Sequence, residues 1–483
     1  MKKTKDWLIV NRYILLGHLC LLLLLILAAI YANVRVLLTD SAYQVFYDLN
    51  NPGMLINDSR YTMVLTQLLP WALIRLNAPL SFVIVGYSVS FVLVGYACWL
   101  ITAYAMGQRK AATLMLFMLL SIGGTFLHCI SESFQLMFYA PMLFGWLCCK
   151  PKEVKVGVVG YYAILALLTA VTFFIYPMSA VYIVFAAGFC LFDSEGRLRL
   201  SVPALATLGM LALYALLYFI MGMSGHDSEF MPTADSLRYA FAHFFTLGSI
   251  TVFYKLFFSY YLFPLLLLFV TLIGYARRGM WLKMAYVGAC VAVFFVAAVV
   301  IYREGDSYIS RERYFIPLFF MIGLAFIEDV LPRLGKRWQT AFYVVFCVML
   351  LYSFGRILHY VHLYEPRLEA VANVASEAES KGQHKLLVTR STAEGLFPLD
   401  IWGLAIESML LTAQQGPEHT VTIYKEDDDF DRTNDDLYNN PDCYIAVNWW
   451  KQWWVKDLNP HYFRLPAQGY KELRADGSIA DLR

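Results

Sequence analysis

The chain has too few charged residues for a water-soluble protein of its length. Of its 483 residues, only 15% are Asp, Glu, Lys or Arg and 59% are hydrophobic, whereas about a quarter of the residues in soluble domains are charged. A surface exposed to water would need more charge, so lipid must be the solvent for most of the chain. A Walker A motif is also missing, which argues against an ATP-driven pump.

Other chemistries are equally poorly represented. The nine cysteines form no CxxC pair and no Cys/His ligand spacing, and eight of them lie in apolar runs, so we interpret them as small apolar residues of helices. The apolar runs contain no series of ionisable residues that would form a proton or ion path. They also lack the paired Gly/Pro-broken segments that mark transporter repeats.

What the chain does contain is long apolar runs, which predict an all-α polytopic membrane bundle of about eleven transmembrane helices. The first run is too long for a signal-peptide core and no A-x-A-like site follows it, so we expect an uncleaved span. The expected spans are 13–36, 82–106, 111–130, 133–149, 156–175, 178–193, 200–223, 257–276, 284–302, 314–331 and 339–360.

Lys and Arg residues follow every second span. The basic segments are the N-terminus and those around Arg109, Lys150, Arg197, Arg277 and Arg333. The positive-inside rule places them in the cytoplasm. The segments 37–81, 224–256, 303–313 and 361–483 then lie outside, and the short basic loops fit a bacterial inner membrane.

The two halves of this organisation differ in character. Residues 1–360 are expected to form the membrane domain, and 361–483 a small extracytoplasmic α/β domain with strands at 384–390, 419–424 and 443–448 and helices at 366–380 and 400–413. The acidic run 426–436 is expected to be a solvated loop, with calcium binding as the alternative. The run NWWKQWW at 448–454 fits core packing, carbohydrate stacking or contact with the membrane surface.

The first outer segment carries the leading candidate residue. Asp40 follows the first span directly, where a carboxylate can serve as a general base or a metal ligand. Alternatively, it caps the amphipathic stretch 41–49. Asp58 and Arg60 come next, suited to a metal or sugar hydroxyl and to a phosphate respectively, or to a turn with a salt bridge. A second amphipathic stretch, 62–76, predicts a helix lying in the membrane interface.

Two further outer segments place charges close to the bilayer. Glu132 lies in the short hairpin HCISES, where a carboxylate is costly unless it is paired or functional. Arg303, Arg311 and Arg313 stand against the positive-inside trend, which a phosphate partner would explain, although pairing with neighbouring acids would as well. The segment 224–256 offers polar residues such as His243 at no fixed spacing.

The order of a span, an acid, interfacial helices and a second span resembles the GT-C superfamily of membrane glycosyltransferases. The RYFIP sequence at 313–317 is similar to segments of these enzymes in which an external Arg-Tyr begins a late span. The resemblance implies a polyprenyl phosphate-linked sugar donor and a glycan, lipid or protein acceptor outside the cytoplasm. It implies that Asp40 is the catalytic base. It further implies that Asp58, Arg60, Glu132, Arg303, Arg311 and Arg313 bind substrate, with Mg or Mn as a possible metal held by Asp40 and Glu132.

Two other functions fit the same pattern. One is a flippase or transporter of lipid-linked sugars, which would need an aqueous central path but no acid in the first outer segment. The other is an O-antigen polymerase or ligase, which also uses external arginines and takes a lipid pyrophosphate donor.

Overall fold

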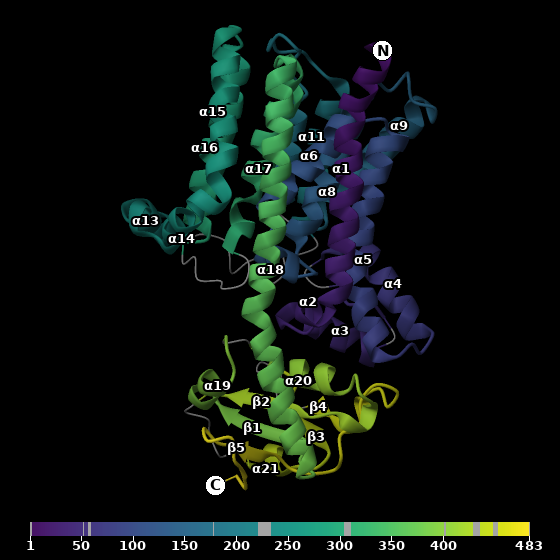
Figure 1. The fold of residues 1–483 in the computed structure, drawn as a ribbon, viewed down its shortest axis with the longest axis vertical. Helices are drawn as coiled ribbons and strands as arrows, with labels where there is room; N and C mark the ends of the chain where they lie inside the picture. Colours follow the sequence, from purple (N-terminus) through teal and green to yellow (C-terminus); the bar gives the residue numbers. More distant parts are fainter. Residues whose placement is uncertain are drawn as a thin grey trace.

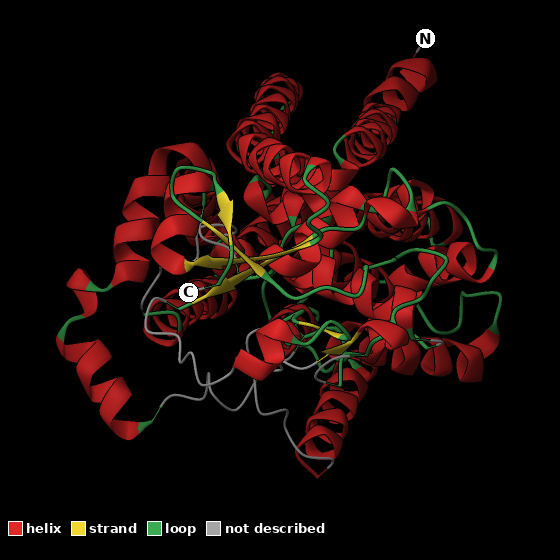
Figure 2. Ribbon diagram, turned by 90° about the horizontal axis from the view of Figure 1, so that it is seen from below, coloured by secondary structure: helices red, strands yellow, loops and turns green. Residues whose placement is uncertain are grey.

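The structure is a computed structural model that describes residues 2–51, 53–56, 59–176, 178–220, 233–303, 311–399, 402–427, 435–447 and 453–482. A helical bundle forms one part, and a smaller region with strands lies beyond one of its ends (Figure 1). Seen from below that view, the strands lie across the end of the bundle (Figure 2). Helix α18 (Lys336–Ser380) runs through both parts.

Among the described residues, seven helical segments are long and apolar enough to cross a membrane. The prediction of an all-α membrane bundle is therefore confirmed at this level. The segments are Arg12–Ile30 of α1 (Lys2–Ile30), α5 (Leu80–Leu100) with η2 (Ile101–Ala105), α11 (Val202–Ile220), α14 (Gly248–Leu256) with η5 (Phe257–Tyr261) and α15 (Leu262–Arg277), α16 (Trp281–Ile301), α17 (Ile316–Ala325) with its flanking turns from Glu312 to Arg333, and α18.

The remaining four expected spans fall on shorter helices. These are α6 (Arg109–Met118) with η3 (Leu119–Ser121) and α7 (Gly124–Leu127), α8 (Glu132–Leu147), α9 (Gly157–Phe173) and α10 (Ser179–Phe189). Helices α8 and α17 are buried along nearly their whole length. They form the centre of the bundle, and the longer apolar helices surround them.

Large apolar side chains cover the outside of the bundle. Phe258 is 80% exposed, and Leu15, Val293 and Leu351 are also exposed along α1, α16 and α18. Exposed apolar surface on this scale is unfavourable in water and is expected where helices face lipid. The exposure pattern therefore agrees with the composition of the chain.

The first expected outer segment is helical where its apolar spacing predicts helices. After α2 (Ala32–Val36) come α3 (Thr39–Asn50), η1 (Tyr61–Met63) and α4 (Val64–Arg75). Helix α4 packs along α5, and α3 packs against α20 (Leu404–Thr412) of the C-terminal region. Helix α3 therefore lies between the bundle and the C-terminal region.

The second expected outer segment is only partly a loop. Its described part contains α13 (Ala234–Ala242), η4 (Phe244–Thr246) and α14. Helix α14 continues through η5 into α15, so the helix begins nine residues before the expected start at 257. The apolar residues of α14 extend the hydrophobic face of the span, which favours one continuous helix.

The C-terminal region contains a four-stranded sheet with the order β2-β1-β5-β6 and a separate two-stranded pair, β3-β4. The strands are β1 (Lys385–Thr389), β2 (Thr422–Glu426), β3 (Cys443–Tyr444), β4 (Trp453–Trp454), β5 (Lys471–Leu473) and β6 (Ile479–Ala480). Strand β1 pairs in parallel with β2 and β5. Helices α19 (Arg390–Leu396), α20 and α21 (Asp435–Asn439) complete the region.

Helix α18 crosses the boundary expected at residue 360. The sequence predicts a span at 339–360 and a separate helix at 366–380, but α18 has 45 residues without interruption. Pro366 lies inside it, where proline normally breaks a helix. The next residue, Arg367, is 2% exposed and binds Glu407 of α20, with Nη2 2.7 Å from Oε2. This buried contact joins α18 to α20 of the C-terminal region.

Candidate functional site

Asp40 lies in the first turn of α3, at the end of the bundle that faces the C-terminal region. Its carboxylate is exposed, and a negative charge in a first turn is favoured by the helix dipole. The preceding residue, Thr39, has φ of 50°. This left-handed conformation is costly for a β-branched residue, and such strain is often found at functional sites.

Helix α3 is tied to the hairpin that carries Glu132. The thiol of Cys129 donates a hydrogen bond to the hydroxyl oxygen of Ser41, with 3.4 Å between the two atoms. Ser41 follows Asp40, and Cys129 precedes Glu132 by three residues. Asp40 and Glu132 therefore lie on neighbouring elements.

Arg60 and Glu132 form an ion pair. Arg60 precedes η1, Glu132 begins α8, and the Arg60 Nη1 donates to Glu132 Oε1. Their side chains are 13% and 14% exposed, so the pair is shielded from most of the solvent. The guanidinium carbon of Arg60 also lies 5.3 Å from the ring centre of Tyr176. Two residues from distant parts of the sequence are thus brought together.

Three tyrosines extend this pair to a third candidate, Arg313. The hydroxyls of Tyr176 and Tyr302 are 2.9 Å apart, and the rings of Tyr302 and Tyr314 stack with centres 4.0 Å apart. The guanidinium of Arg313 lies 5.2 Å from the Tyr314 ring centre. We call Arg60, Glu132, Tyr176, Tyr302, Arg313 and Tyr314 the arginine–tyrosine cluster.

A buried carboxylate fixes the backbone beside Arg313. Glu312 is 1% exposed, and its Oε1 accepts hydrogen bonds from the Thr125 amide at 2.6 Å and the Thr125 hydroxyl at 2.9 Å. This contact joins η6 (Arg311–Phe315) to α7. Among the salt bridges of the described residues, none involves the Arg313 guanidinium. Glu312 therefore positions its neighbour rather than neutralising it.

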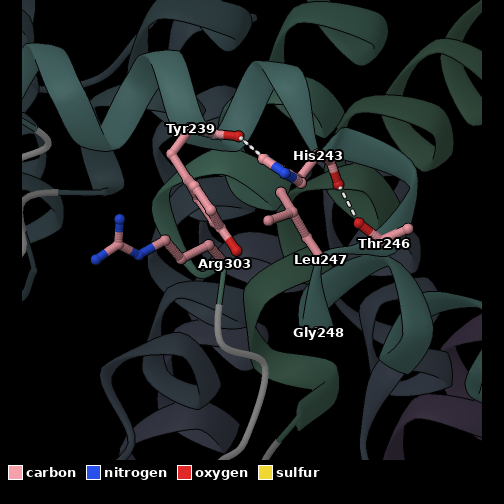
Figure 3. Close-up of a pocket in the computed structure, with 6 residues that line it drawn as sticks. All are labelled: Tyr239, His243, Thr246, Leu247, Gly248 and Arg303. Atoms are coloured by element: carbon pink, nitrogen blue, oxygen red, sulfur yellow. Dashed lines mark hydrogen bonds between the residues drawn. The ribbon is translucent and has the colours of Figure 1, made fainter.

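Arg303 lines a separate cavity of about 490 Å³ with Tyr239, His243, Thr246, Leu247 and Gly248. His243 stacks on Tyr239 with ring centres 4.3 Å apart. The guanidinium of Arg303 points away from His243 (Figure 3). The backbone carbonyl oxygen of Arg303 accepts a hydrogen bond from the Ser249 amide at 3.3 Å. The cavity thus brings Arg303 together with the expected second outer segment.

Two predicted site residues have no described side chain. Asp58 lies outside the described residues, and Arg311 is described only as the first residue of η6. Within the described part of the chain, no group of three or more His, Cys, Asp or Glu side chains is placed to hold a metal ion. Glu132 is engaged by Arg60. A metal held by Asp40 and Glu132 stays a prediction.

The tryptophan-rich run is partly described. Residues 448–452 lie outside the described residues, but Trp453 packs 6.0 Å from Phe46 of α3, between ring centres. Phe46 also lies 5.3 Å from Phe463. The backbone amide of Asn459 donates a hydrogen bond to Asn50 Oδ1 at 2.8 Å, which joins Asn459 to the end of α3. For Trp453 these contacts favour packing over an exposed binding surface.

The structure adds residues that the sequence did not single out. Tyr176 and Tyr302 link the predicted residues, but nothing distinguishes them among 33 tyrosines. Asp48, on α3, is 5% exposed, and its Oδ1 accepts from the Leu55 amide at 2.9 Å. Burial raises the pKa of Asp48 to about 7, which its bond to Leu55 only partly offsets. In the sequence, Asp48 could have been noticed as an acidic residue within the amphipathic stretch 41–49.

No protein-family model, no curated protein and no solved structure matches this chain.

Proposed function

We propose that this chain is a membrane glycosyltransferase that transfers a sugar from a polyprenyl phosphate-linked donor to an acceptor outside the cytoplasm. The observation that supports it best is the arginine–tyrosine cluster. It gathers Arg60, Glu132 and Arg313, which come from three outer segments that resemble the GT-C pattern. The contact between Cys129 and Ser41 joins the hairpin that carries Glu132 to α3, which presents Asp40.

The proposed topology has about eleven spans, with α6 to α10 crossing as shorter helices within the bundle. The N-terminus lies in the cytoplasm, the C-terminal region forms an extracytoplasmic domain, and the membrane is a bacterial inner membrane. The alternation of basic loops supports this orientation. The acceptor then approaches from the side of the C-terminal domain.

In the proposed reaction, Asp40 takes the proton from an acceptor hydroxyl. The acceptor oxygen forms a bond to the anomeric carbon of the sugar while the bond from that carbon to the phosphate oxygen breaks. The electron pair of that bond leaves with the polyprenyl phosphate. Arg313, with Arg303 and Arg311, neutralises the charge on the departing phosphate, because a guanidinium binds phosphate oxygens through a planar fork. Arg60, Glu132 and Asp58 bind acceptor or sugar.

The test uses the purified full chain in proteoliposomes with labelled undecaprenyl phosphate-linked glucose, mannose and aminoarabinose, and a cell-envelope extract as the source of acceptor. We expect the native chain to release undecaprenyl phosphate from one donor. The variants Asp40→Asn and Arg313→Gln should not release it. Asp457→Asn and Arg464→Gln, which change exposed residues of the C-terminal region, serve as matched controls. Full activity of Asp40→Asn would refute its role as base.

The two alternatives predict different products. A flippase would move the labelled donor between leaflets without cleaving it, and Asp40→Asn would leave that movement unchanged. A polymerase or ligase would cleave only a pyrophosphate-linked donor, so undecaprenyl pyrophosphate-linked sugar is included in the panel.

A further inference from the structure

A second cavity lies at the opposite end of the bundle and takes no part in the proposed reaction. Its volume is about 540 Å³. It is formed by the turn 194–197, the connection between α15 and α16, and the end of η8 (Leu331–Arg333). The side chains that matter here are Glu195, Arg197, Arg278, Trp281, Leu282 and Arg333. We call this the basic pocket.

Two of its arginines are held in place by backbone carbonyls. Arg333 donates from Nη1 to the Asp329 carbonyl at 2.6 Å and from Nη2 to the Ser194 carbonyl at 2.9 Å. Arg278 donates from Nη1 to the same Asp329 carbonyl at 3.3 Å. The two guanidinium groups therefore converge on the backbone carbonyl of Asp329.

Nearby carboxylates already have other partners. The Asp329 carboxylate lies 2.6 Å from Lys283 Nζ and accepts from the Tyr275 hydroxyl at 2.8 Å. Arg333 Nη1 is farther away, at 3.7 Å from Asp329 Oδ1. Asp193 accepts from backbone amides of its own turn at 2.8 and 2.9 Å. The remaining acid is Glu195, which lies 2.9 Å from Arg197.

The pocket therefore carries an excess of positive charge. Three guanidinium groups and one carboxylate line it. Burial lowers the pKa of Arg278 and the positive charge of the neighbouring Arg333 lowers it further, an effect that the charge of Asp329 only partly offsets. Two like charges held this close favour an anion that contacts both, and arginine binds phosphate oxygens in a bidentate manner.

Apolar side chains next to the pocket indicate that the anion belongs to a lipid. Trp281 and Leu282, which begin α16, are 60% and 56% exposed. On the other side, Leu198 and Leu200 are 62% and 77% exposed. The pocket also lies where three membrane-crossing segments end, at Arg277, Trp281 and Arg333, so it is at the level of lipid headgroups.

We propose that the basic pocket binds the phosphate of an anionic phospholipid, with Arg197, Arg278 and Arg333 contacting the headgroup and Trp281 and Leu282 contacting its glycerol and acyl chains. The shared chemistry is a phosphate-bearing anion, which a soluble phosphate or nucleotide also carries. The apolar rim favours the lipid. This site is independent of the transfer reaction and of the residues assigned to it.

The test measures lipid binding to the purified full chain by native mass spectrometry, with phosphatidylglycerol, cardiolipin or phosphatidylcholine added. We expect the anionic lipids to remain bound and Arg278→Gln/Arg333→Gln to weaken their binding at least tenfold. The double variant Arg277→Gln/Arg337→Gln removes the same charge from exposed residues at the same end and should bind as the native chain does.

Arg197→Gln serves as a second variant, because its side chain is 78% exposed and its loss should not affect folding. Its matched control is Arg199→Gln, an exposed residue two positions along. Equal binding of phosphatidylcholine, or equal losses in the variants and their controls, would overturn the proposal. Binding of inorganic pyrophosphate to the native chain with no retained lipid would assign the pocket to a soluble anion and overturn the lipid assignment.

Discussion

Asp48 makes the stability of the chain depend on pH. Its pKa is raised from an ordinary value near 4 to about 7 because the carboxyl is buried. The folded state therefore binds more protons than the unfolded state between these values, and stability falls as the pH rises through this range. The slope is at most about 1.4 kcal/mol per pH unit, and it disappears above the folded-state pKa.

The variant Asp48→Asn tests this. The amide oxygen can still accept from Leu55, but the side chain no longer ionises. We measure the midpoint temperature of thermal unfolding in detergent. For the native chain we expect it to decrease as the pH rises from 5 to 7, and for the variant we expect a smaller decrease. Parallel profiles for the two proteins would show that Asp48 does not ionise in this range.

The Arg60–Glu132 pair is expected to be coupled. Both side chains are largely shielded. Glu132→Gln removes the charge that Arg60 contacts, and Arg60→Gln removes the charge that Glu132 contacts. In a double-mutant cycle we expect a coupling energy of about 0.5–3 kcal/mol, measured by thermal unfolding in detergent. If the effects of the single changes simply add, the pair contributes nothing to folding.

At this scale the sequence indicated which charges to examine but not how they meet. Glu132 stood out because a carboxylate near the bilayer is costly unless it is paired, Arg313 because it opposes the positive-inside trend, and Arg60 because it could bind a phosphate. Their gathering depends on the packing of α8, η1 and η6, which lie far apart in the sequence. The linking residues Tyr176 and Tyr302 carry no charge and sit among many tyrosines, so no local pattern could identify them.

Among the elements, α18 and α20 are joined by a buried ion pair. Arg367 donates from Nε and Nη2 to the Glu407 carboxylate and from Nη1 to the Leu399 carbonyl at 2.6 Å. Burial raises the pKa of Glu407, and the charge of Arg367 acts in the opposite direction. Removing one partner of a buried pair costs about 3–5 kcal/mol.

We therefore expect Glu407→Gln to loosen the C-terminal region from α18. Limited proteolysis and hydrogen exchange should show faster cleavage and exchange in α20 and β2, while the bundle stays protected. Glu377→Gln is the matched control, since its pair with Lys381 on α18 is about half exposed. Equal protection in both variants would mean that apolar contacts alone hold the region in place.

The elements of the first outer segment were predictable because apolar residues recur at helical spacing in 41–49 and 62–76. The continuity of α18 was not, because Pro366 and the polar residues after it indicate a break. The contact between Arg367 and Glu407 is long-range, and such contacts override local preferences. The early start of α14 has the same kind of cause, since it extends a face packed against the bundle.

For the whole molecule, the orientation is open to direct measurement. We expect a cysteine in place of the exposed Ala475 to react with a membrane-impermeant maleimide in intact spheroplasts. A cysteine in place of Lys336 should react only after permeabilisation. Both substitutions are made in a background in which the exposed Cys148 is replaced by alanine. The reverse pattern would place the C-terminal region in the cytoplasm and contradict the proposed function.

The overall class followed from composition, because a chain with so little charge must be solvated by lipid. The number of spans did not follow as directly. Three expected spans fall on short, largely buried helices, α6, α8 and α10, whose apolar sequence reflects burial among other helices as much as contact with lipid. Apolar runs alone do not separate these two environments.

The length of the unbroken helix α18 sets both the distance between the membrane part and the C-terminal region and the rotation of one relative to the other. With 45 residues it measures about 68 Å from end to end. Each residue inserted between its membrane part and Arg367 would move the C-terminal region about 1.5 Å farther from the membrane part and rotate it by about 100° about the helix axis. An insertion of seven residues nearly restores the angle while changing the height. The spacing and the facing of the two parts can therefore be varied separately, by counting residues.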